Sequence, residues 1–312
     1  MALLTTAWCC VLLSLIRITQ RVRSAAFSQT SRGTVVRNVE VEDSRRTYWL
    51  HVPSTYAKTK PIPLVLVFHG GEGQPQQIER HTGFSDLADR DNFIVAYPEG
   101  LNKHWNDGRE HAPRVDDVAF VAAIIEDVAR SFNVDRKRIY ATGISNGGMF
   151  SQRLACELSG TIAAIASVAA SMPDALDVRC KPSRPISVLM INGTNDPLIP
   201  YGGGAIPGTK LGGKVLSTPD TIKFWVDHNK CSQRPTTVLL PDQDQQDDTR
   251  VRRENYNHCA SAVEVELDAV EGGGHTLPGA RQYLPERFIG KTSRDINGSE
   301  TIWSFFKRHP AK

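Results

Sequence analysis

Apolar residues recur with a helical period in one long segment, residues 116–132. Successive apolar positions fall three or four residues apart, which places them on one face of a helix. They are Val118, Val121, Ala122, Ile125, Val128 and Phe132. Asp116 and Asp117 stand at the start of this segment, where carboxylates cap a helix and stabilise its dipole. We therefore expect a structural role for this acidic pair and not a chemical one.

Short apolar runs alternate with further helical segments along most of the chain. The predicted strands after the first hairpin are residues 64–68, 93–97, 138–142, 162–169, 186–191 and 263–270, and the other predicted helices are residues 76–88, 146–158, 220–229 and 299–308. Strands that alternate with helices are typical of a parallel sheet covered on both faces. Residues 34–41 and 47–52 instead predict an antiparallel hairpin. The expected fold class is α/β, with a doubly wound, mostly parallel sheet and an N-terminal antiparallel hairpin.

One strand-turn-helix segment has the sequence of a nucleophile elbow. Gly143-Ile144-Ser145-Asn146-Gly147 lies between a predicted strand and a predicted helix, which is the context that this motif requires. A side chain at either glycine would collide with the adjoining strand or helix. Ser145 is therefore the candidate nucleophile. The backbone N–H of Asn146, at the helix start, is a candidate donor to an oxyanion.

A serine hydroxyl needs a base and an acid before it can act as a nucleophile. Asp196 follows the predicted strand 186–191, and His275 follows the predicted strand 263–270. The carboxyl ends of parallel strands meet at one edge of a sheet, so Ser145, Asp196 and His275 are expected to converge there. This order along the chain is that of α/β-hydrolases and differs from the two common protease orders.

A glycine loop supplies the second predicted oxyanion donor. The strand 64–68 leads into His69-Gly70-Gly71-Glu72-Gly73, and the backbone N–H of Gly71 is expected to act together with that of Asn146. His69 is expected to fix this loop by hydrogen bonding and not to act as the catalytic base.

Together these motifs resemble the polyhydroxybutyrate depolymerase and feruloyl esterase branch of the α/β-hydrolases. The segments that carry the resemblance are FHGG at 68–71, AYPEG at 96–100 with Trp105-Asn106 beyond it, VDDVAF at 115–120, GISNGGM at 143–149, NGTNDPLIPYGGG at 192–204 and GGGHTLPG at 272–279. The resemblance implies an extracellular or periplasmic serine esterase that forms an acyl-enzyme. Its implied substrates are polyhydroxyalkanoate oligomers or feruloyl and acetyl esters of plant polysaccharide. Asn192 departs from the family, whose members often have His at this position.

Two aromatic residues are candidates for substrate contact. Trp105 and Tyr201 follow strands at the presumed active-site edge, where they would stack against an acyl or aromatic group or, alternatively, only support loops. Two other classes of protein remain as alternatives. A serine peptidase would need a further substrate-binding domain that this length excludes, and a non-catalytic binding protein of the same fold has usually lost the serine or the histidine.

The resemblance implies an ester substrate, either polymeric or short, as the partner of this chain, and composition adds no other partner. The chain has 312 residues, 40% of them hydrophobic, which is enough for one large core, and its net charge of +3 is too small to predict nucleic-acid binding. The acidic run 241–248 is expected to be a solvated loop or a hairpin insertion and not a metal site. Residues 208–214 fit part of a phosphate loop, but Val215 replaces the required Ser or Thr. We expect no cofactor, no metal and no obligate protein partner.

The N-terminal residues predict export. Residues 2–16 are apolar but too few to span a membrane, and Ser24-Ala25-Ala26 fits a cleavage site. Arginines follow this stretch and none precedes it, which is the reverse of a usual signal peptide. We expect residues 1–30 to be a signal peptide or, alternatively, a disordered or mis-started leader. Residues 31–312 are expected to form a single catalytic domain, secreted or periplasmic, without stable membrane insertion.

Cysteine usage favours the same compartment. Cys9 and Cys10 fall in the leader, and Cys156, Cys180, Cys231 and Cys259 remain, which permits three pairings. We expect Cys231 to pair with Cys259, because the acidic insertion lies between them and flanking strands would bring them together. Cys156 has the alternative of a small buried core residue.

Overall fold

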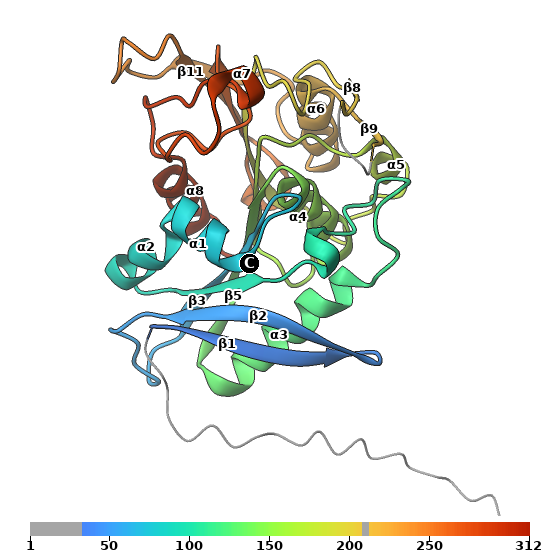
Figure 1. Ribbon diagram of the computed structural model, residues 1–312, viewed down its shortest axis with the longest axis vertical. Helices are drawn as coiled ribbons and strands as arrows, with labels where there is room; N and C mark the ends of the chain where they lie inside the picture. Colours follow the sequence, from blue (N-terminus) through green and yellow to red (C-terminus); the bar gives the residue numbers. More distant parts are fainter. Residues whose placement is uncertain (1–32, 208–211) are drawn as a thin grey trace, which may run out of the picture. The chain divides into compact units, whose positions relative to one another are not determined.

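The structure is a computed structural model that describes residues 33–207 and 212–312. The predicted leader, with Cys9 and Cys10, lies outside the described residues, as does most of the glycine-rich segment 208–214. One ten-stranded sheet runs through the described part in the order β1-β2-β4-β3-β5-β6-β7-β12-β11-β10 (Figure 1). Its strands are β1 Gly33–Val41, β2 Ser44–Val52, β3 Ile62–Phe68, β4 Ile94–Pro98, β5 Val134–Ile144, β6 Ala164–Val168, β7 Ser187–Gly193, β10 Thr236–Leu239, β11 Arg250–Tyr256 and β12 Val265–Glu271.

The centre of the sheet is parallel and both of its ends are antiparallel. Strands β4, β3, β5, β6, β7 and β12 pair in parallel. The hairpin β1–β2 lies antiparallel on one end, and β11 and β10 lie antiparallel on the other. The predicted fold class and the N-terminal hairpin are therefore confirmed. A separate pair of short strands, β8 Gly204–Ala205 and β9 Lys214–Val215, forms its own small sheet.

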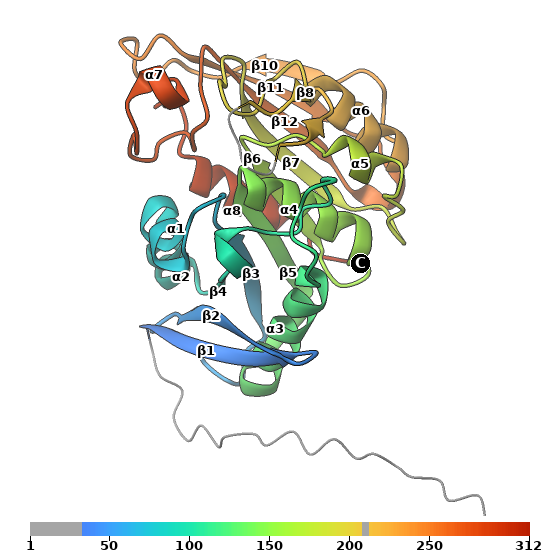
Figure 2. The same cartoon turned by 45° about the vertical axis from the view of Figure 1, so that its right-hand side comes forward.

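Two layers of helices cover the sheet. Helices α1 Pro75–Thr82, α2 Phe84–Asp91 and α8 Gly298–Arg308 pack on one face, and α3 Asp117–Ser131, α4 Asn146–Glu157 and α6 Thr218–His228 pack on the other (Figure 2). Short helices complete the set: α5 Asp174–Asp177, α7 Glu286–Ile289 and the 3-10 turns Leu101–Lys103 and Ala260–Ala262. No helix within the described ranges has the length and hydrophobicity needed to cross a bilayer.

One sequence prediction about helices needs correction, and one is extended by the structure. The predicted helix 76–88 is two helices, because Gly83 between them adopts φ 63°, a left-handed conformation that ends α1. Asp116 caps α3 as expected, since its side chain accepts a hydrogen bond from the Ala119 N–H at 2.8 Å. Asp117, by contrast, is fully buried and pairs with the Arg46 guanidinium at 2.7 Å, so it joins the helix to β2.

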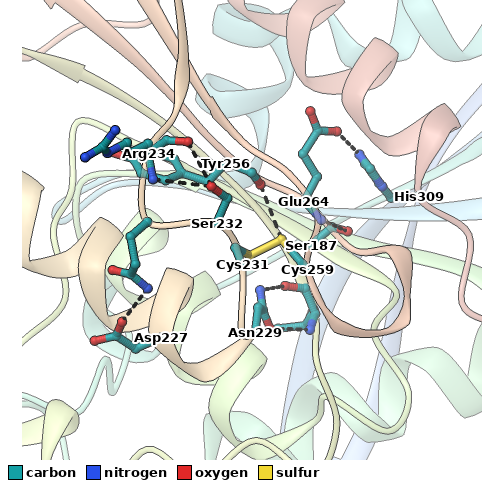
Figure 3. The surroundings of a disulfide bond; sticks show 12 residues. Ser187, Asp227, Asn229, Cys231, Ser232, Arg234, Tyr256, Cys259, Glu264 and His309 are labelled. Carbon is teal, nitrogen blue, oxygen red and sulfur yellow. Dashed lines mark hydrogen bonds and ion pairs between the residues drawn. A yellow bond between two sulfur atoms is a disulfide. The ribbon is translucent and has the colours of Figure 1, made fainter.

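Two disulfides are present in the described part of the chain. Cys231, after α6, bonds to Cys259, after β11, as predicted (Figure 3). The Asn229 side chain, which lies beside this bond, ties the end of α6 to Ile186 just before β7. The second bond joins Cys156 to Cys180, so Cys156 is a buried half-cystine and not a free core residue. The acidic run 241–248 connects β10 to β11, which confirms a hairpin insertion.

Candidate active site

Ser145 occupies a strained turn between β5 and α4. Its φ of 57° and ψ of −123° are rare for a residue with a side chain. A Cβ at Gly143 would lie 2.5 Å from the Gly147 carbonyl carbon, and a Cβ at Gly147 would lie 2.5 Å from the carbonyl oxygens of Phe68 and His69. Both glycines of the elbow are therefore required by close backbone approach. The Ser145 N–H also donates to the Val168 carbonyl at 2.9 Å, which anchors the turn to β6.

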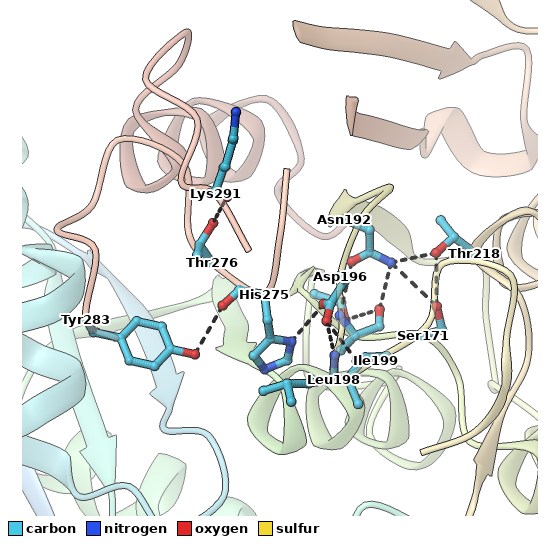
Figure 4. Close-up of polar contacts among 12 residues, drawn as sticks. Ser171, Asn192, Asp196, Leu198, Ile199, Thr218, His275, Thr276, Tyr283 and Lys291 are labelled. Carbon is cyan, nitrogen blue, oxygen red and sulfur yellow. Dashed lines mark hydrogen bonds and ion pairs between the residues drawn. The ribbon is translucent and has the colours of Figure 1, made fainter. Parts of the chain in front are cut away.

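Asp196 and His275 are brought together across β7 and β12. Asp196 Oδ2 accepts a hydrogen bond from His275 Nδ1 at 2.7 Å, and both side chains are almost completely buried. The other carboxylate oxygen of Asp196 accepts from the backbone N–H groups of Leu198 at 2.7 Å and Ile199 at 2.8 Å (Figure 4). The carboxylate is therefore fixed on three sides. The bond to Nδ1 also sets the imidazole tautomer and leaves Nε2 as the acceptor.

Among the described residues, no hydrogen bond joins His275 to Ser145. Catalytic hydrogen bonds of this kind often tighten only when substrate is bound. The glycine loop lies close to the serine, since a Cβ at Gly70 would be 3.5 Å from the Ser145 Cβ. The glycine loop after β3 is therefore packed directly against the elbow.

Hydrogen bonds hold the glycine loop in place from both sides. His69 Nδ1 donates to the Gly70 carbonyl at 2.7 Å, and His69 Nε2 accepts the Gly100 N–H at 3.0 Å. Burial lowers the pKa of His69 to about 4, so the ring is neutral at pH 7, as this pattern of one donated and one accepted bond requires. The Glu72 N–H donates to the Lys103 carbonyl at 3.0 Å. The expectation that His69 fixes the loop is confirmed.

Gly71 and Asn146, the predicted oxyanion donors, lie beside one another. A Cβ at Gly71 would be 4.0 Å from the Asn146 Cβ and 3.2 Å from Nε2 of His104. The His104 ring therefore covers this glycine, a contact that sequence reasoning missed. Asn146 is the first residue of α4, so its N–H has no partner within the helix.

The two aromatic candidates differ in their exposure. Trp105 is fully buried and stacks on Phe150, with ring centroids 5.2 Å apart and an interplanar angle of 6°. Its Nε1 donates to the His69 carbonyl at 2.9 Å. Because no face of this ring is open, Trp105 supports the glycine loop, which was the alternative to substrate contact. Tyr201 is half-buried, with Arg252 beside its hydroxyl, and its contact with substrate stays a prediction.

Two further residues that hold the His275 backbone were not found from the sequence. The Tyr283 hydroxyl donates to the His275 carbonyl at 3.1 Å (Figure 4). The His275 N–H donates to the Ile289 carbonyl at 2.6 Å, so the segment around α7 holds the histidine backbone. Burial raises the pKa of Tyr283 to about 12, so the phenol stays protonated. Tyr283 follows His275 by eight residues without any recognisable motif.

Asn192, which departs from the resemblance, is buried and makes several hydrogen bonds. Its Oδ1 accepts the Ala170 N–H at 3.0 Å, and its Nδ2 donates to the Thr218 hydroxyl at 2.9 Å. Asn192 thus ties the end of β7, just before the Asp196 turn, to the loop after β6 and to the start of α6 (Figure 4).

The sheet order, the strained serine turn and the paired acid and histidine are those of an α/β-hydrolase. Comparison with known proteins supports this class. The acetyl xylan esterase from Aspergillus awamori superposes with a TM-score of 0.58 at 13% identity, over 88% of this chain and 99% of that chain.

Sequence comparison defines the family. The sequence model of the family Esterase PHB depolymerase matches residues 46–206, which are just over half of the chain. The putative esterase NocK of Nocardia uniformis subsp. tsuyamanensis is 33% identical over 284 residues, which cover 87% of this chain and 82% of that protein. Feruloyl esterase B of Piromyces equi is 31% identical over 238 residues, which cover 72% of this chain and 41% of that protein. The chain belongs to the Esterase PHB depolymerase family and is a carboxylic ester hydrolase.

Proposed function

We propose that Ser145, His275 and Asp196 form a catalytic triad that hydrolyses esters through an acyl-enzyme. His275 Nε2 takes the hydroxyl proton as Ser145 Oγ attacks the ester carbonyl, and Asp196 stabilises the imidazolium that results. The backbone N–H groups of Gly71 and Asn146 donate to the oxyanion. The proton then passes to the leaving alcohol as the C–O bond breaks, which leaves the acyl group on Ser145.

Deacylation repeats these steps with water. His275 takes a proton from a water molecule as the water oxygen attacks the acyl carbon, and a second tetrahedral intermediate forms in the same site. The proton then passes to Ser145 Oγ as the carboxylic acid departs. In other hydrolases, loss of one oxyanion donor raises the barrier by roughly 2.7 to 4 kcal/mol. The three triad side chains and the two backbone N–H groups supply all the groups that this proposed reaction uses.

One observation carries the proposal more than any other. The carboxylate of Asp196 is held by three hydrogen bonds and itself holds His275 in the tautomer whose Nε2 is unprotonated. The imidazole fixed in this way follows β12, and the strained serine follows β5, so both stand at the carboxyl edge of the same parallel sheet. The arrangement supports a general base whose partner is Ser145.

The substrate class is proposed from the family and its members. The family description names PHB depolymerase, and a relative is named a feruloyl esterase. We propose esters of hydroxycinnamic or acetic acid on plant polysaccharide, or oligomers of 3-hydroxyalkanoates, as the natural substrates. Parallel assays with methyl ferulate, acetylated xylan and 3-hydroxybutyrate oligomers will rank them, because kcat/KM ratios report differential binding of the transition state.

The compartment is part of the proposal. Two disulfides within the described residues are typical of proteins that fold in an oxidising environment. They support a secreted or periplasmic enzyme whose residues 31–312 act as one catalytic domain.

Replacement of the nucleophile tests the proposal. In a Ser145→Ala variant we expect turnover of p-nitrophenyl acetate to fall to the background rate, with the thermal midpoint nearly unchanged. Ser232→Ala, in the loop between α6 and β10, is the control and should retain wild-type turnover. Wild-type activity in Ser145→Ala refutes the assignment.

A further inference from the structure

The side chain of Asn146 is fully engaged in hydrogen bonds within the protein. Its Oδ1 accepts the Trp105 N–H at 2.8 Å, and its Nδ2 donates to the Trp105 carbonyl at 3.1 Å and to Asp107 Oδ2 at 2.6 Å. Asn146 is only 3% exposed. These three buried hydrogen bonds fix the Asn146 side chain in one rotamer, and they constrain the Asn146 backbone as well.

Asp107 and Arg109 form a buried ion pair behind this amide. The Asp107 side chain is fully buried, and the Arg109 side chain is 4% exposed. Asp107 Oδ2 accepts from Arg109 Nε at 2.8 Å as well as from Asn146, and Asp107 Oδ1 accepts the Arg109 N–H at 3.1 Å. Arg109 also donates to the Gly212 carbonyl at 2.9 Å. Burial of both charges carries a desolvation penalty of several kcal/mol per ion before pairing compensates it.

The buried Asp107–Arg109 ion pair is costly for a core that hydrophobic residues could fill, so we look for its function at the active site. An oxyanion hole stabilises the transition state only if its donors are fixed before charge develops. The N–H of Asn146 cannot be fixed by helix hydrogen bonding, because it belongs to the first residue of α4. The anchored serine turn fixes this residue from one side, and the Asn146 side chain, which is held by Asp107, fixes it from the other.

We infer that Asp107 and Arg109 are positioning residues that orient Asn146 for oxyanion stabilisation. The inference rests on the proposed function, in which the Asn146 amide is an oxyanion donor. Asp107 sets the Asn146 rotamer through its 2.6 Å bond, and Arg109 holds the Asp107 carboxylate in place through its own 2.8 Å bond. Neither residue touches the substrate.

The test compares Asp107→Ala, Asp107→Asn and Arg109→Lys with a matched control, Asp268→Ala. Asp268 is also fully buried and pairs with Arg253 through two bonds of 2.7 Å, but it lies within β12. We expect kcat for p-nitrophenyl acetate to fall about 10- to 100-fold in Asp107→Ala, with KM within about threefold of wild type, because oxyanion bonds act mainly in the transition state. In Asp268→Ala, thermal stability should fall while kcat is retained.

A second readout separates positioning from general destabilisation. Phenylboronic acid forms a tetrahedral adduct with a reactive serine, so its inhibition constant should rise in Asp107→Ala by a factor similar to the loss in kcat/KM. Asp107→Asn keeps an oxygen that can accept from Asn146, so it should recover part of kcat, and Arg109→Lys should fall between them. These two variants decide the question if Asp107→Ala does not fold.

Different results would contradict the positioning role of Asp107 and the proposed catalytic triad. If Asp107→Ala and Asp107→Asn, assayed where circular dichroism shows them folded, both match Asp268→Ala in kcat and in boronate inhibition, the positioning role is wrong while the triad stands. If Ser145→Ala retains activity, the proposed function itself is wrong.

Discussion

Asp196 Oδ2 lies 2.7 Å from Nδ1 of His275, although the two residues are 79 positions apart in the chain. The parallel pairing of β7 with β12 creates this contact, because Asp196 follows the end of β7 and His275 follows the end of β12. Close packing of the two turns completes it, since a Cβ at Gly193 would lie 2.4 Å from the carbonyl oxygens of Gly273 and Gly274.

Loss of the Asp196 charge should impair chemistry and not folding. Asp196→Asn keeps the shape of the side chain but favours the wrong imidazole tautomer, and an equivalent change in a serine protease lowers kcat about 10⁴-fold. We expect a decrease of about 10³- to 10⁴-fold in kcat for p-nitrophenyl acetate, with little change in the thermal midpoint. A variant with wild-type kcat would show that the Asp196–His275 bond is only structural.

Gly147→Ala should disturb the elbow, because the new methyl group would meet the carbonyl oxygens of Phe68 and His69 at 2.5 Å. The backbone must shift to relieve this contact, and we expect a loss of about 2 kcal/mol or more in the free energy of unfolding together with a lower kcat. Gly160→Ala is the control, since its nearest neighbour would be Ser183 Oγ at 3.7 Å. Equal urea midpoints for the two variants would contradict this account.

The Cys231–Cys259 disulfide should stabilise the fold without supporting catalysis. Its loop spans 28 residues, and closing a loop of this size stabilises by about 3 to 4 kcal/mol in the chain-entropy treatment. The double variant Cys231→Ser, Cys259→Ser should therefore unfold at lower urea while kcat at 25 °C stays within about twofold of wild type. A large loss of kcat in the folded double variant would place this bond in the catalytic machinery.

Much of the fold and of the candidate site follows from the sequence because the necessary signals are local. Apolar runs mark the six parallel strands, and the glycines around Ser145 are required by backbone contacts that any elbow makes. Asp196 and His275 could be placed because each follows a strand and parallel strands end at a common edge. The pairing of Cys231 with Cys259 was expected because the acidic insertion lies between them and flanking strands would bring them together, and the structure contains this bond.

Other features depend on contacts that no local pattern encodes. Strand β11 has a charged sequence in which only Val251 is fully buried, so it lacks the apolar signal of a strand. The break between α1 and α2 depends on the left-handed conformation of Gly83. Trp105 is as buried as a core residue although it lies in a polar loop. Asp107 contacts Asn146 at a separation of 39 residues, and Tyr283 contacts His275 at a separation of eight, and no motif marks either contact.

Glu266 should make stability depend on pH. Burial raises the pKa of Glu266 from 4.5 to about 7, although Arg253 and Arg308 lower it and the nearby Asp268 and Glu264 raise it further. A raised carboxyl pKa means that the folded state binds the proton more tightly than the unfolded state. The resulting stability is fully present below pH 4.5 and is lost as the pH rises through 7, by about 3 kcal/mol in all.

A Glu266→Gln variant isolates this contribution. His69 acts in the opposite direction, because its lowered pKa of about 4 gives stability that is present above pH 6.5 and is lost as the pH falls through 4. The difference between wild type and Glu266→Gln cancels the His69 contribution. We expect the wild type to lose about 3 kcal/mol relative to the variant between pH 4 and pH 8, as measured by urea unfolding. A difference that is constant across this range would contradict the buried, protonated carboxyl.

Mass spectrometry of the enzyme after treatment with a fluorophosphonate ester tests the central claim most directly. Such reagents phosphonylate a serine only where a base and an oxyanion hole activate it. We predict the addition of one phosphonyl group, mapped by peptide sequencing to Ser145, with complete loss of esterase activity and no labelling of Ser145→Ala. Inactivation with the label on a different residue and Ser145 unmodified would contradict the account.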